Sequence, residues 1–234
     1  MNKFTFLLIL ISCSAVTVFA QNKEKEIKMK TRVDSVSYII GYDLGQNFKS
    51  QSIEINPEVM LAAILEGMKQ SKQLISNQES EKVLAAYVDE IQKKKQTEQS
   101  DQIKKTKQEG EAFLIANKTK PGVKTTTSGL QYKVIREGTG ASPKPTDKVM
   151  VHYAGKLVNG TKFDASYDRG TPAEFPVNGV ILGWQEGLLL MKEGGKYELY
   201  IPSELAYGDT GAGESVPGGA VLIFEVELIK VIPQ

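Results

Sequence analysis

The spacing of the apolar residues changes at Pro121-Gly122, and this change divides the chain of 234 residues into two parts. Before it, apolar residues recur every three or four positions, the period of an α-helix with one buried face. After it they recur at every second position, the period of a strand in a half-buried sheet. A proline followed by glycine also interrupts a helix. We therefore predict an all-helical first part and an α+β second part beginning near residue 125.

Two helices are predicted at the start of the first part. The first carries one apolar face, made of Val36, Ile39, Ile40, Leu44 and Phe48. Gly41 and Gly45 lie one turn apart and would let a second helix approach closely. Asn56-Pro57, an N-cap residue followed by proline at the first helical position, begins the second helix. Because two short helices cannot bury such faces alone, we expect them to form a homodimer.

A third helix is predicted to begin at the capping box Ser76-Asn77-Gln78-Glu79. Within residues 92–111 only Ile103 is strongly apolar, so this stretch is expected to have no buried face. It is either a solvated helix between two folded parts or a frayed linker, and the apolar residues on both sides favour the helix. An unbroken helix over residues 77–117 would be about 60 Å long at 1.5 Å per residue.

The second part has the pattern of an antiparallel sheet covered by one short helix. Apolar residues alternate with others over residues 130–134, 149–153, 197–201 and 222–228. Asn159-Gly160 is a dipeptide typical of a two-residue hairpin turn. Ile181, Trp184, Leu188 and Met191 follow the helical period instead, so they indicate a helix that packs on the sheet.

Residues 1–20 have the composition of a secretory signal. A lysine near the start precedes an apolar run that ends in Val18-Phe19-Ala20, and the run is too short for a permanent membrane span. We expect cleavage after Ala20 and a location in the periplasm or cell envelope. The alternative is a lipid anchor on Cys13, within Leu10-Ile11-Ser12-Cys13, but the residues after this cysteine are apolar where a lipoprotein usually becomes polar.

The charge balance and residue inventory exclude several classes of function. The chain has 29 basic and 28 acidic residues. Cleavage of the signal would remove Lys3 and no acidic residue, so the mature chain would carry equal numbers of the two. Because such a chain has no net charge, nucleic acid is not an expected partner. His152 is the only histidine and falls out of phase with the apolar residues of its strand. A Ser-His-Asp triad and a histidine or cysteine metal site are therefore not expected. We expect no metal and no cofactor.

Six aromatic residues and one acid form the remaining candidate site. The ordinary interpretation of any one of these aromatics is a core position. However, Tyr207 lies in a glycine-rich loop rather than a periodic strand, and Asp164 directly follows an aromatic residue. These two departures favour a binding pocket made of Tyr153, Phe163, Phe175, Trp184, Tyr207 and Phe224, with Asp164 beside them.

Five stretches of the second part, in this order, resemble the FKBP-type peptidyl-prolyl cis-trans isomerases: "VHYAGKLVNGTKFDAS", "DRGTP", "VILGWQEGL", "GGKYELYIPSELAYG" and "VPGGAVLIFEVELI". The resemblance covers nearly all of residues 128–231. The helical first part is similar to that of the secreted two-domain bacterial members, the macrophage infectivity potentiator and FkpA subgroup. The expected domains are a signal at 1–20, a dimerisation domain at 21–75, a connecting helix at 76–118, a linker at 119–127 and the isomerase domain at 128–234.

The resemblance implies an antiparallel sheet half-wrapped around a short helix, with an apolar pocket between them. It implies that the chain isomerises X-Pro bonds, with unfolded or exported polypeptides as substrates and macrolides of the FKBP class as possible inhibitors. Trp184 would be the floor on which a proline ring rests. Asp164 would pair with Arg169 or Tyr153 at the rim, and the Tyr207 hydroxyl would hold a substrate carbonyl. The other binding residues would be Tyr153, Phe163, Phe175, Val180, Ile181, Val216 and Phe224, and the catalytic residues Asp164, Tyr207 and Phe163.

The chain departs from the family pattern at three places. Ala173 stands where some relatives have an aromatic residue, and Ser215 stands where they have an aliphatic one. The loop around 212–214 is one residue longer than in the small single-domain members. These departures affect the expected peptide preference and macrolide affinity more than the activity. The alternative function is a non-catalytic holdase chaperone, in which the helices grip unfolded chains and the pocket captures proline without turnover.

Overall fold

The computed structural model describes residues 27–234. The predicted signal and Cys13 lie outside the described residues. The chain divides into two compact units, one ending at Leu74 and one spanning Ile75–Gln234. Each is described by itself.

The first unit contains α1 (Arg32–Ser50) and α2 (Pro57–Met68), each begun by a side-chain cap. Thr31 and Asp34 form a reciprocal capping box at α1. At α2 the Asn56 side chain accepts hydrogen bonds from two backbone N–H groups, and Pro57 occupies the first turn, as the sequence predicts. Neither helix contains a buried residue. The exposed large apolar side chains of this unit include Val33, Val36, Ile39, Ile40, Leu44, Val59, Leu61, Ile64, Leu65 and Met68.

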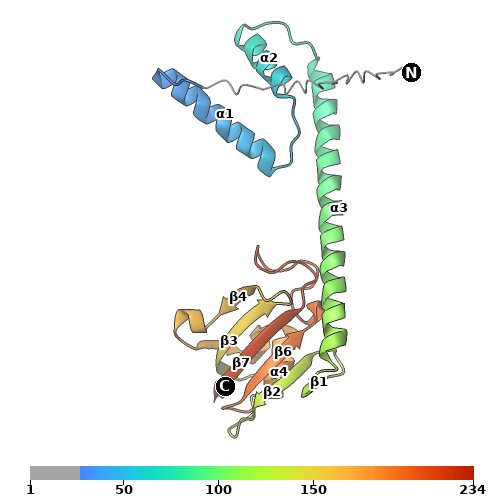
Figure 1. Cartoon of the computed structure of the whole chain (residues 1–234), viewed down its shortest axis with the longest axis vertical. Helices are drawn as coiled ribbons and strands as arrows, with labels where there is room; N and C mark the ends of the chain where they lie inside the picture. Colours follow the sequence, from blue (N-terminus) through green and yellow to red (C-terminus); the bar gives the residue numbers. More distant parts are fainter. Residues whose placement is uncertain (1–26) are drawn as a thin grey trace, which may run out of the picture. The chain divides into compact units, whose positions relative to one another are not determined.

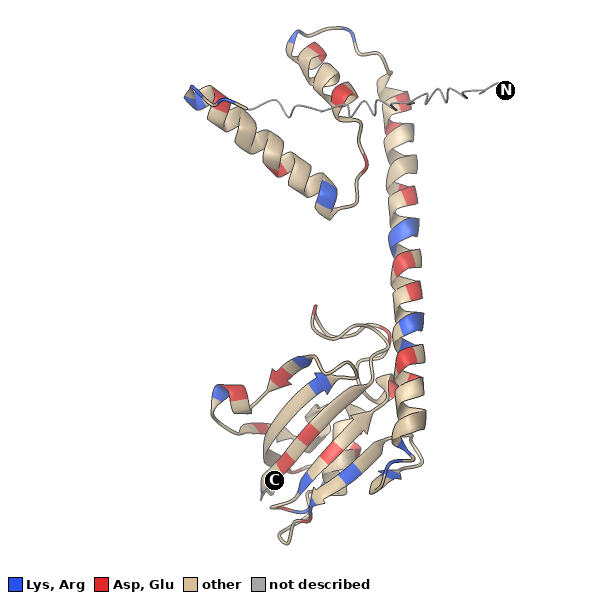
Figure 2. Cartoon of the chain, in the orientation of Figure 1, with Lys and Arg blue, Asp and Glu red and all other residues tan. Residues whose placement is uncertain are grey.

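The second unit begins with α3 (Asn77–Asn117), a single helix of 41 residues (Figure 1). The Ser76 side chain accepts a hydrogen bond from the Glu79 N–H, so the cap predicted from the sequence is formed. Charged residues of both signs follow one another along much of the helix (Figure 2). The stretch 92–111 lies within α3, so it is a helix and not a frayed linker. No helix among residues 27–234 is both long enough and apolar enough to span a membrane.

The C-terminal half of α3 is less solvated than the sequence predicts. One side of it is shielded from solvent at positions 103, 106, 107, 110, 113, 114 and 117, and Gly110 and Asn117 are buried. These positions recur every three or four residues and therefore lie on one helical face. The expectation that residues 92–111 bury no face is wrong for their last turns, because a glycine and a lysine stem can pack closely without appearing as an apolar stripe.

Seven strands form one antiparallel sheet in the rest of this unit. The sheet has the order β1-β2-β6-β7-β3-β4, and β5 also pairs with β3. β1 lies within the stretch predicted as a linker. The strands are β1 (Val123–Thr125), β2 (Gln131–Arg136), β3 (Lys148–Leu157), β4 (Lys162–Ala165), β5 (Ala173–Pro176), β6 (Lys196–Ile201) and β7 (Leu222–Ile232).

The core of the second unit lies between the sheet and α4 (Leu182–Leu189). β7 is central, paired with β6 on one side and β3 on the other, and its Leu222, Phe224, Val226 and Leu228 are all buried. On α4 the side chains facing the sheet include Trp184 and Leu188. The predicted antiparallel sheet around a short helix is confirmed.

Candidate active site

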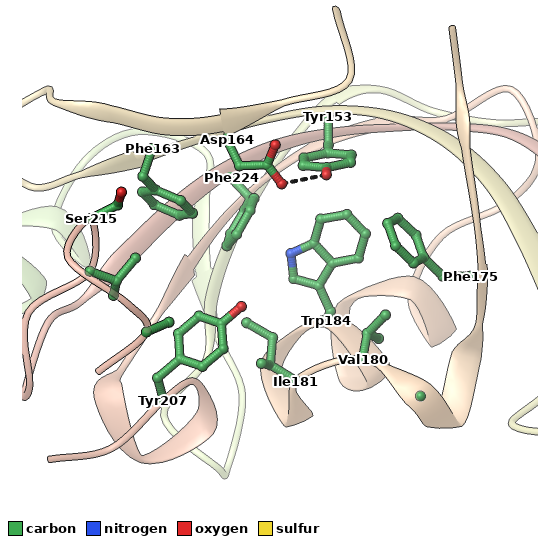
Figure 3. Close-up of a pocket in the computed structure, with 13 residues that line it drawn as sticks. Tyr153, Phe163, Asp164, Phe175, Val180, Ile181, Trp184, Tyr207, Ser215 and Phe224 are labelled. Atoms are coloured by element: carbon green, nitrogen blue, oxygen red, sulfur yellow. Dashed lines mark hydrogen bonds between the residues drawn. The ribbon is translucent and has the colours of Figure 1, made fainter. Parts of the chain in front are cut away.

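A cavity of about 450 Å³ opens between α4, the sheet and two loops (Figure 3). Its walls are almost entirely apolar, and the polar lining groups are a carboxylate and three hydroxyls. The lining residues are Tyr153, Phe163, Asp164, Phe175, Gly179, Val180, Ile181, Trp184, Tyr207, Ala212, Ser215, Val216 and Phe224.

Trp184 forms the floor of the cavity from the first turn of α4. Its ring is 4% exposed and lies nearly perpendicular to three others, at centroid distances of 5.2 Å from Tyr153, 5.8 Å from Phe175 and 5.2 Å from Phe224. Edge-to-face pairs of this kind are favourable because the ring edge is positive and the ring face negative. The indole N–H has no hydrogen-bond partner within residues 27–234. In Figure 3 it faces the side where Phe224 lies, which is compatible with a weak N–H···π contact.

The wall made by β3, β4 and β7 requires a glycine. Gly155 of β3 lies opposite Phe224 of β7, and Phe163 packs edge-to-face on Phe224 at 5.4 Å. A Cβ atom at position 155 would lie 2.6 Å from the Phe224 ring and 2.7 Å from the Phe163 ring. Only a residue without a side chain lets the two rings close over the strand.

The polar rim is a closed triangle of Tyr153, Asp164 and Arg169. The Tyr153 hydroxyl donates to Asp164 Oδ2 at 2.5 Å, and the Arg169 guanidinium donates to Asp164 Oδ1 and to Tyr153 Oη, both at 2.7 Å. The sequence offered Arg169 or Tyr153 as the partner of Asp164, and the structure contains both contacts.

The pKa values of Asp164 and Tyr153 in this triangle are shifted in opposite directions. Burial raises the pKa of Asp164, but hydrogen bonds from Tyr153 and Arg169 lower it more, so the net shift is downward. Burial and the hydrogen bond to Asp164 raise the pKa of Tyr153. The carboxylate is therefore held charged and the phenol neutral near neutral pH, an arrangement that suits orientation of the rim better than proton transfer.

A glycine-rich loop after β6 provides the remaining wall. Tyr207 is 40% exposed, and its hydroxyl faces the cavity in Figure 3. Within residues 27–234 this hydroxyl has no hydrogen-bond partner, so it is free to donate to a ligand. Ala212 and Val216 pair through two backbone hydrogen bonds and place Val216 against the cavity.

The structure brings together ten of the eleven side chains predicted for the site. Arg169 does not line the cavity and reaches it only through its contacts with Asp164 and Tyr153. Three lining residues, Gly179, Ala212 and Ser215, were not predicted as site residues. Each is a sequence neighbour, or a near neighbour, of one that was.

His152 lies outside the cavity. Its Nδ1 is 3.0 Å from the Ser166 hydroxyl, and its ring stacks on Tyr167 at a centroid distance of 4.6 Å. Neither histidine nor cysteine is among the lining residues. Fold and site together define a class of protein: a small sheet domain with an open apolar cavity lined by aromatic rings, beside a phenol that is free to donate a hydrogen bond.

Comparison with known proteins places the chain in a family. The model of the FKBP-type peptidyl-prolyl cis-trans isomerase matches residues 140–229, and the model of the domain amino-terminal to it matches residues 33–134. The chain is 41% identical over 203 residues to the outer membrane protein MIP of Legionella longbeachae, covering 87% of each chain. It is 44% identical over 197 residues to the FKBP-type 22 kDa peptidyl-prolyl cis-trans isomerase of Escherichia coli K12, covering 84% of this chain and 94% of that one.

A solved structure agrees with these matches over both units. The crystal structure of FkpA from Escherichia coli has a TM-score of 0.74 and 34% sequence identity, covering 88% of this chain and 99% of that one. The chain belongs to the FKBP-type peptidyl-prolyl cis-trans isomerases.

Proposed function

We propose that this isomerase seats the proline ring of its substrate on Trp184, with the Tyr207 hydroxyl donating to a carbonyl beside the bond that rotates. The observation that supports this most strongly is the cavity itself. It is open, apolar and large enough for a five-membered ring and its neighbouring backbone, and a free phenol stands beside it.

Such a pocket needs no general base. Rotation about an X-Pro bond breaks no σ bond and has only to overcome the loss of amide resonance, a barrier of roughly 18–20 kcal/mol. A planar amide is more charge-separated than a twisted one, so transfer from water to an apolar cavity disfavours the planar ground state more. A thousandfold acceleration requires only about 4 kcal/mol of such differential stabilisation.

The polar groups of the rim would refine this effect. Tyr207 would stabilise the carbonyl of the twisted amide, and Phe163 would pack against the reacting segment. Asp164, held by Tyr153 and Arg169, would orient the rim and bias the carbonyl electrostatically without exchanging a proton. Val180, Ile181, Phe175, Val216 and Phe224 would enclose the ring.

Replacing Trp184 with leucine in the full chain tests this assignment. Leucine preserves an apolar residue but removes the flat floor, so kcat/KM for a proline tetrapeptide should fall by about 10- to 100-fold. Tyr132→Leu is the matched control, because Tyr132 stacks on Tyr197 away from the cavity. Equal activity in the wild type and the Trp184 variant would exclude the proposed floor. Competition by a macrolide of the FKBP class would test the same pocket independently.

We further propose that α1 and α2 join two copies of the chain. Val33 is 74% exposed, Ile39 56% and Met68 79%, and neither helix has a buried residue. Soluble proteins rarely leave contiguous apolar surface of this kind uncovered. A second copy offers the same faces and covers both at once. Light scattering of the purified chain should give twice the monomer mass, and a monomeric mass at micromolar concentration would reject the dimer.

The site of action we propose is the periplasm or cell envelope, where the enzyme would assist the folding of exported proteins. The support is the signal-like composition of residues 1–20. The intact mass of the mature protein tests it: a chain beginning at Gln21 indicates simple cleavage, and an acylated chain beginning at Cys13 indicates a lipid anchor. An unprocessed mass would contradict export.

A holdase activity is the second candidate function, and the exposed apolar faces of α1 and α2 favour it. It can be separated from isomerisation with the Trp184→Leu variant. If the helices act as a chaperone, this variant should still suppress aggregation of a reduced client protein while its isomerase activity is lost. Loss of both activities together would show that the pocket alone binds clients.

A further inference from the structure

The last turns of α3 contact the loop that forms one wall of the active site. We call residues 207–219 the pocket loop; it includes Tyr207, Ala212 and Val216, which line the cavity. Lys107 Nζ of α3 lies 2.5 Å from Asp209 Oδ1 of this loop. At the other end of the loop, Ile103 and Lys107 are so close to Gly219 that a Cβ atom there would lie 2.8 Å from Lys107 Cγ.

Backbone hydrogen bonds within the pocket loop hold its two ends together. Gly219 N–H donates to the Gly208 carbonyl at 2.8 Å, which brings the start and the end of the loop together beside α3. Between them, Ala212 and Val216 exchange two backbone hydrogen bonds. A displacement where the helix touches Asp209 or Gly219 is therefore transmitted to the lining residues.

The helix is a firm support, because its C-terminal end is fixed elsewhere on the sheet domain. Asn117 Nδ2 donates to Gln131 Oε1 at 3.0 Å, and Gln131 Nε2 donates to the Leu114 carbonyl at 2.9 Å. Phe113 packs against Tyr200 of β6 at a centroid distance of 6.0 Å. These contacts anchor α3 to β2 and β6 without involving the pocket loop.

A third contact sets the distance between the helix and the strand that follows the loop. Gly110 is buried, and a Cβ atom at this position would lie 2.7 Å from Val221 Cγ2. Because valine has a restricted χ1, its methyl groups cannot easily turn away. The absence of a side chain at position 110 thus fixes how closely α3 approaches the start of β7.

We propose that Ile103, Lys107 and Gly110 of α3 are positioning residues for the isomerase pocket: they hold the pocket loop, and so set the affinity for prolyl segments, from outside the cavity. This inference rests on the prolyl-binding role proposed above. The long helix then has a second function besides connecting the two units. A disturbance of its last turns reaches the active site through Asp209, Gly219 and Val221.

The expected effect is on binding and not on global stability. The side chains of Lys107 and Asp209 are 37% and 62% exposed, and exposed ion pairs contribute little to stability. Small misplacements of binding groups, by contrast, can cost large factors in activity. We expect Lys107→Ala to raise KM for a proline tetrapeptide about threefold, with kcat changed by less than twofold and Tm nearly unchanged.

Conservative and matched variants distinguish positioning from a general effect of charge. Lys107→Arg should restore KM to near the wild-type value, and Asp209→Asn should behave like Lys107→Ala. Lys105→Ala removes the same charge from the exposed side of α3 and should leave KM unchanged. Raising the ionic strength should increase KM in the wild type, because the exposed pair is screened, but not in Lys107→Ala.

Gly110→Ala provides a second test that does not depend on charge. Alanine favours the helix by roughly 1 kcal/mol relative to glycine, so a change in activity cannot be ascribed to a weaker helix. The added methyl group should push the strand and loop away, raise KM several-fold, and shift the emission of Trp184, the only tryptophan of the chain. Val221→Ala in the same chain should recover most of the lost affinity.

Two outcomes overturn the proposal. One is unchanged KM and unchanged Trp184 emission in both Lys107→Ala and Gly110→Ala. The other is an equal rise of KM in Lys105→Ala, which would indicate a general effect of charge. A wild-type chain that binds no prolyl peptide would instead refute the proposed role of the pocket, so the two failures are distinguishable. Should Gly110→Ala fail to fold, the Lys107 series decides alone.

Discussion

α1 and β7 are both rich in large apolar residues, but only those of β7 are buried. Leu222, Val226 and Leu228 of β7 are completely inaccessible, whereas Val33 and Ile39 of α1 are mostly exposed. β7 finds partners on both sides within its own chain, in β3 and β6. The difference indicates that the isomerase domain is complete in a single chain, while α1 and α2 carry surface suited to a second molecule.

Truncating one large apolar side chain in each region tests this difference directly. Leu222→Ala leaves a cavity in a closed core and should lower the free energy of unfolding by about 2–5 kcal/mol. Ile40→Ala in α1 should cost less than about 1 kcal/mol when the protein is dilute enough to be monomeric. Denaturant unfolding followed by circular dichroism measures both. Equal losses would mean that α1 is packed within its own chain.

A charge placed on the apolar face of α1 should dissociate the proposed dimer. Ile39→Glu would place a carboxylate in the shared apolar contact, and we expect the dimerisation constant to weaken by at least about 100-fold, since an unpaired buried charge is costly. Each isomerase domain should keep its kcat/KM for a tetrapeptide. Lys49→Glu is the control, because it places a carboxylate on the same helix at a position that is already charged and lies off this face. Sedimentation equilibrium measures the mass, and an Ile39→Glu chain that stays dimeric would contradict the proposed contact.

Within the isomerase domain, replacing Gly155 tests whether close packing of the rings determines the shape of the pocket. The Cβ of Gly155→Ala would meet both Phe163 and Phe224, so the two rings must separate. We expect kcat/KM to fall by about tenfold and Tm by several degrees. Gly160→Ala is a glycine control, because its Cβ would meet no atom within 4 Å, although its φ of 87° carries some strain. Unchanged kcat/KM in the Gly155 variant would show that these rings can move without effect.

The smallest expected effect is that of pH. Burial raises the pKa of Asp164, but the hydrogen bonds from Tyr153 and Arg169 lower it more, so the pKa lies below its usual value and the carboxyl stays ionised at neutral pH. Its contribution to stability is present above the unfolded pKa and is lost only as the pH falls through the folded one. From pH 5 to 8 we expect kcat/KM to change by less than about twofold. An inflection near pH 5–6 that disappears in Asp164→Asn would identify a proton-transfer role instead.

Local signals predicted the element starts well. Asn56-Pro57 and Ser76 begin helices by capping backbone N–H groups within three residues, so a short window of sequence contains the whole interaction. The alternation over residues 149–153 and 222–228 likewise marks strands whose buried faces are seen in the structure. The residues of the candidate site could be predicted because its aromatic residues lie in motifs that resemble those of a known family.

What the sequence did not predict depends on contacts between distant segments. The packing of Lys107 and Gly110 against the pocket loop involves no apolar stripe, since a glycine contributes only space and a lysine only its stem. The role of Gly155 could not be predicted either, because it depends on the rings of Phe163 and Phe224, which lie on other strands. The short β1 was hidden in a polar stretch and is a strand only because β2 lies beside it.

The pairing of β3 with β7 has a consequence for biosynthesis. Tyr153 and Phe224 of the cavity are separated by some seventy residues of chain, and β7 is the final strand to leave the ribosome. Contacts so distant in sequence slow the search for the native state. The rings around Trp184 can therefore assemble only after β7 has been synthesised, because Phe224 is one of them. A nonsense mutation that removes only the last strand would leave most of the polypeptide intact and still abolish the enzyme.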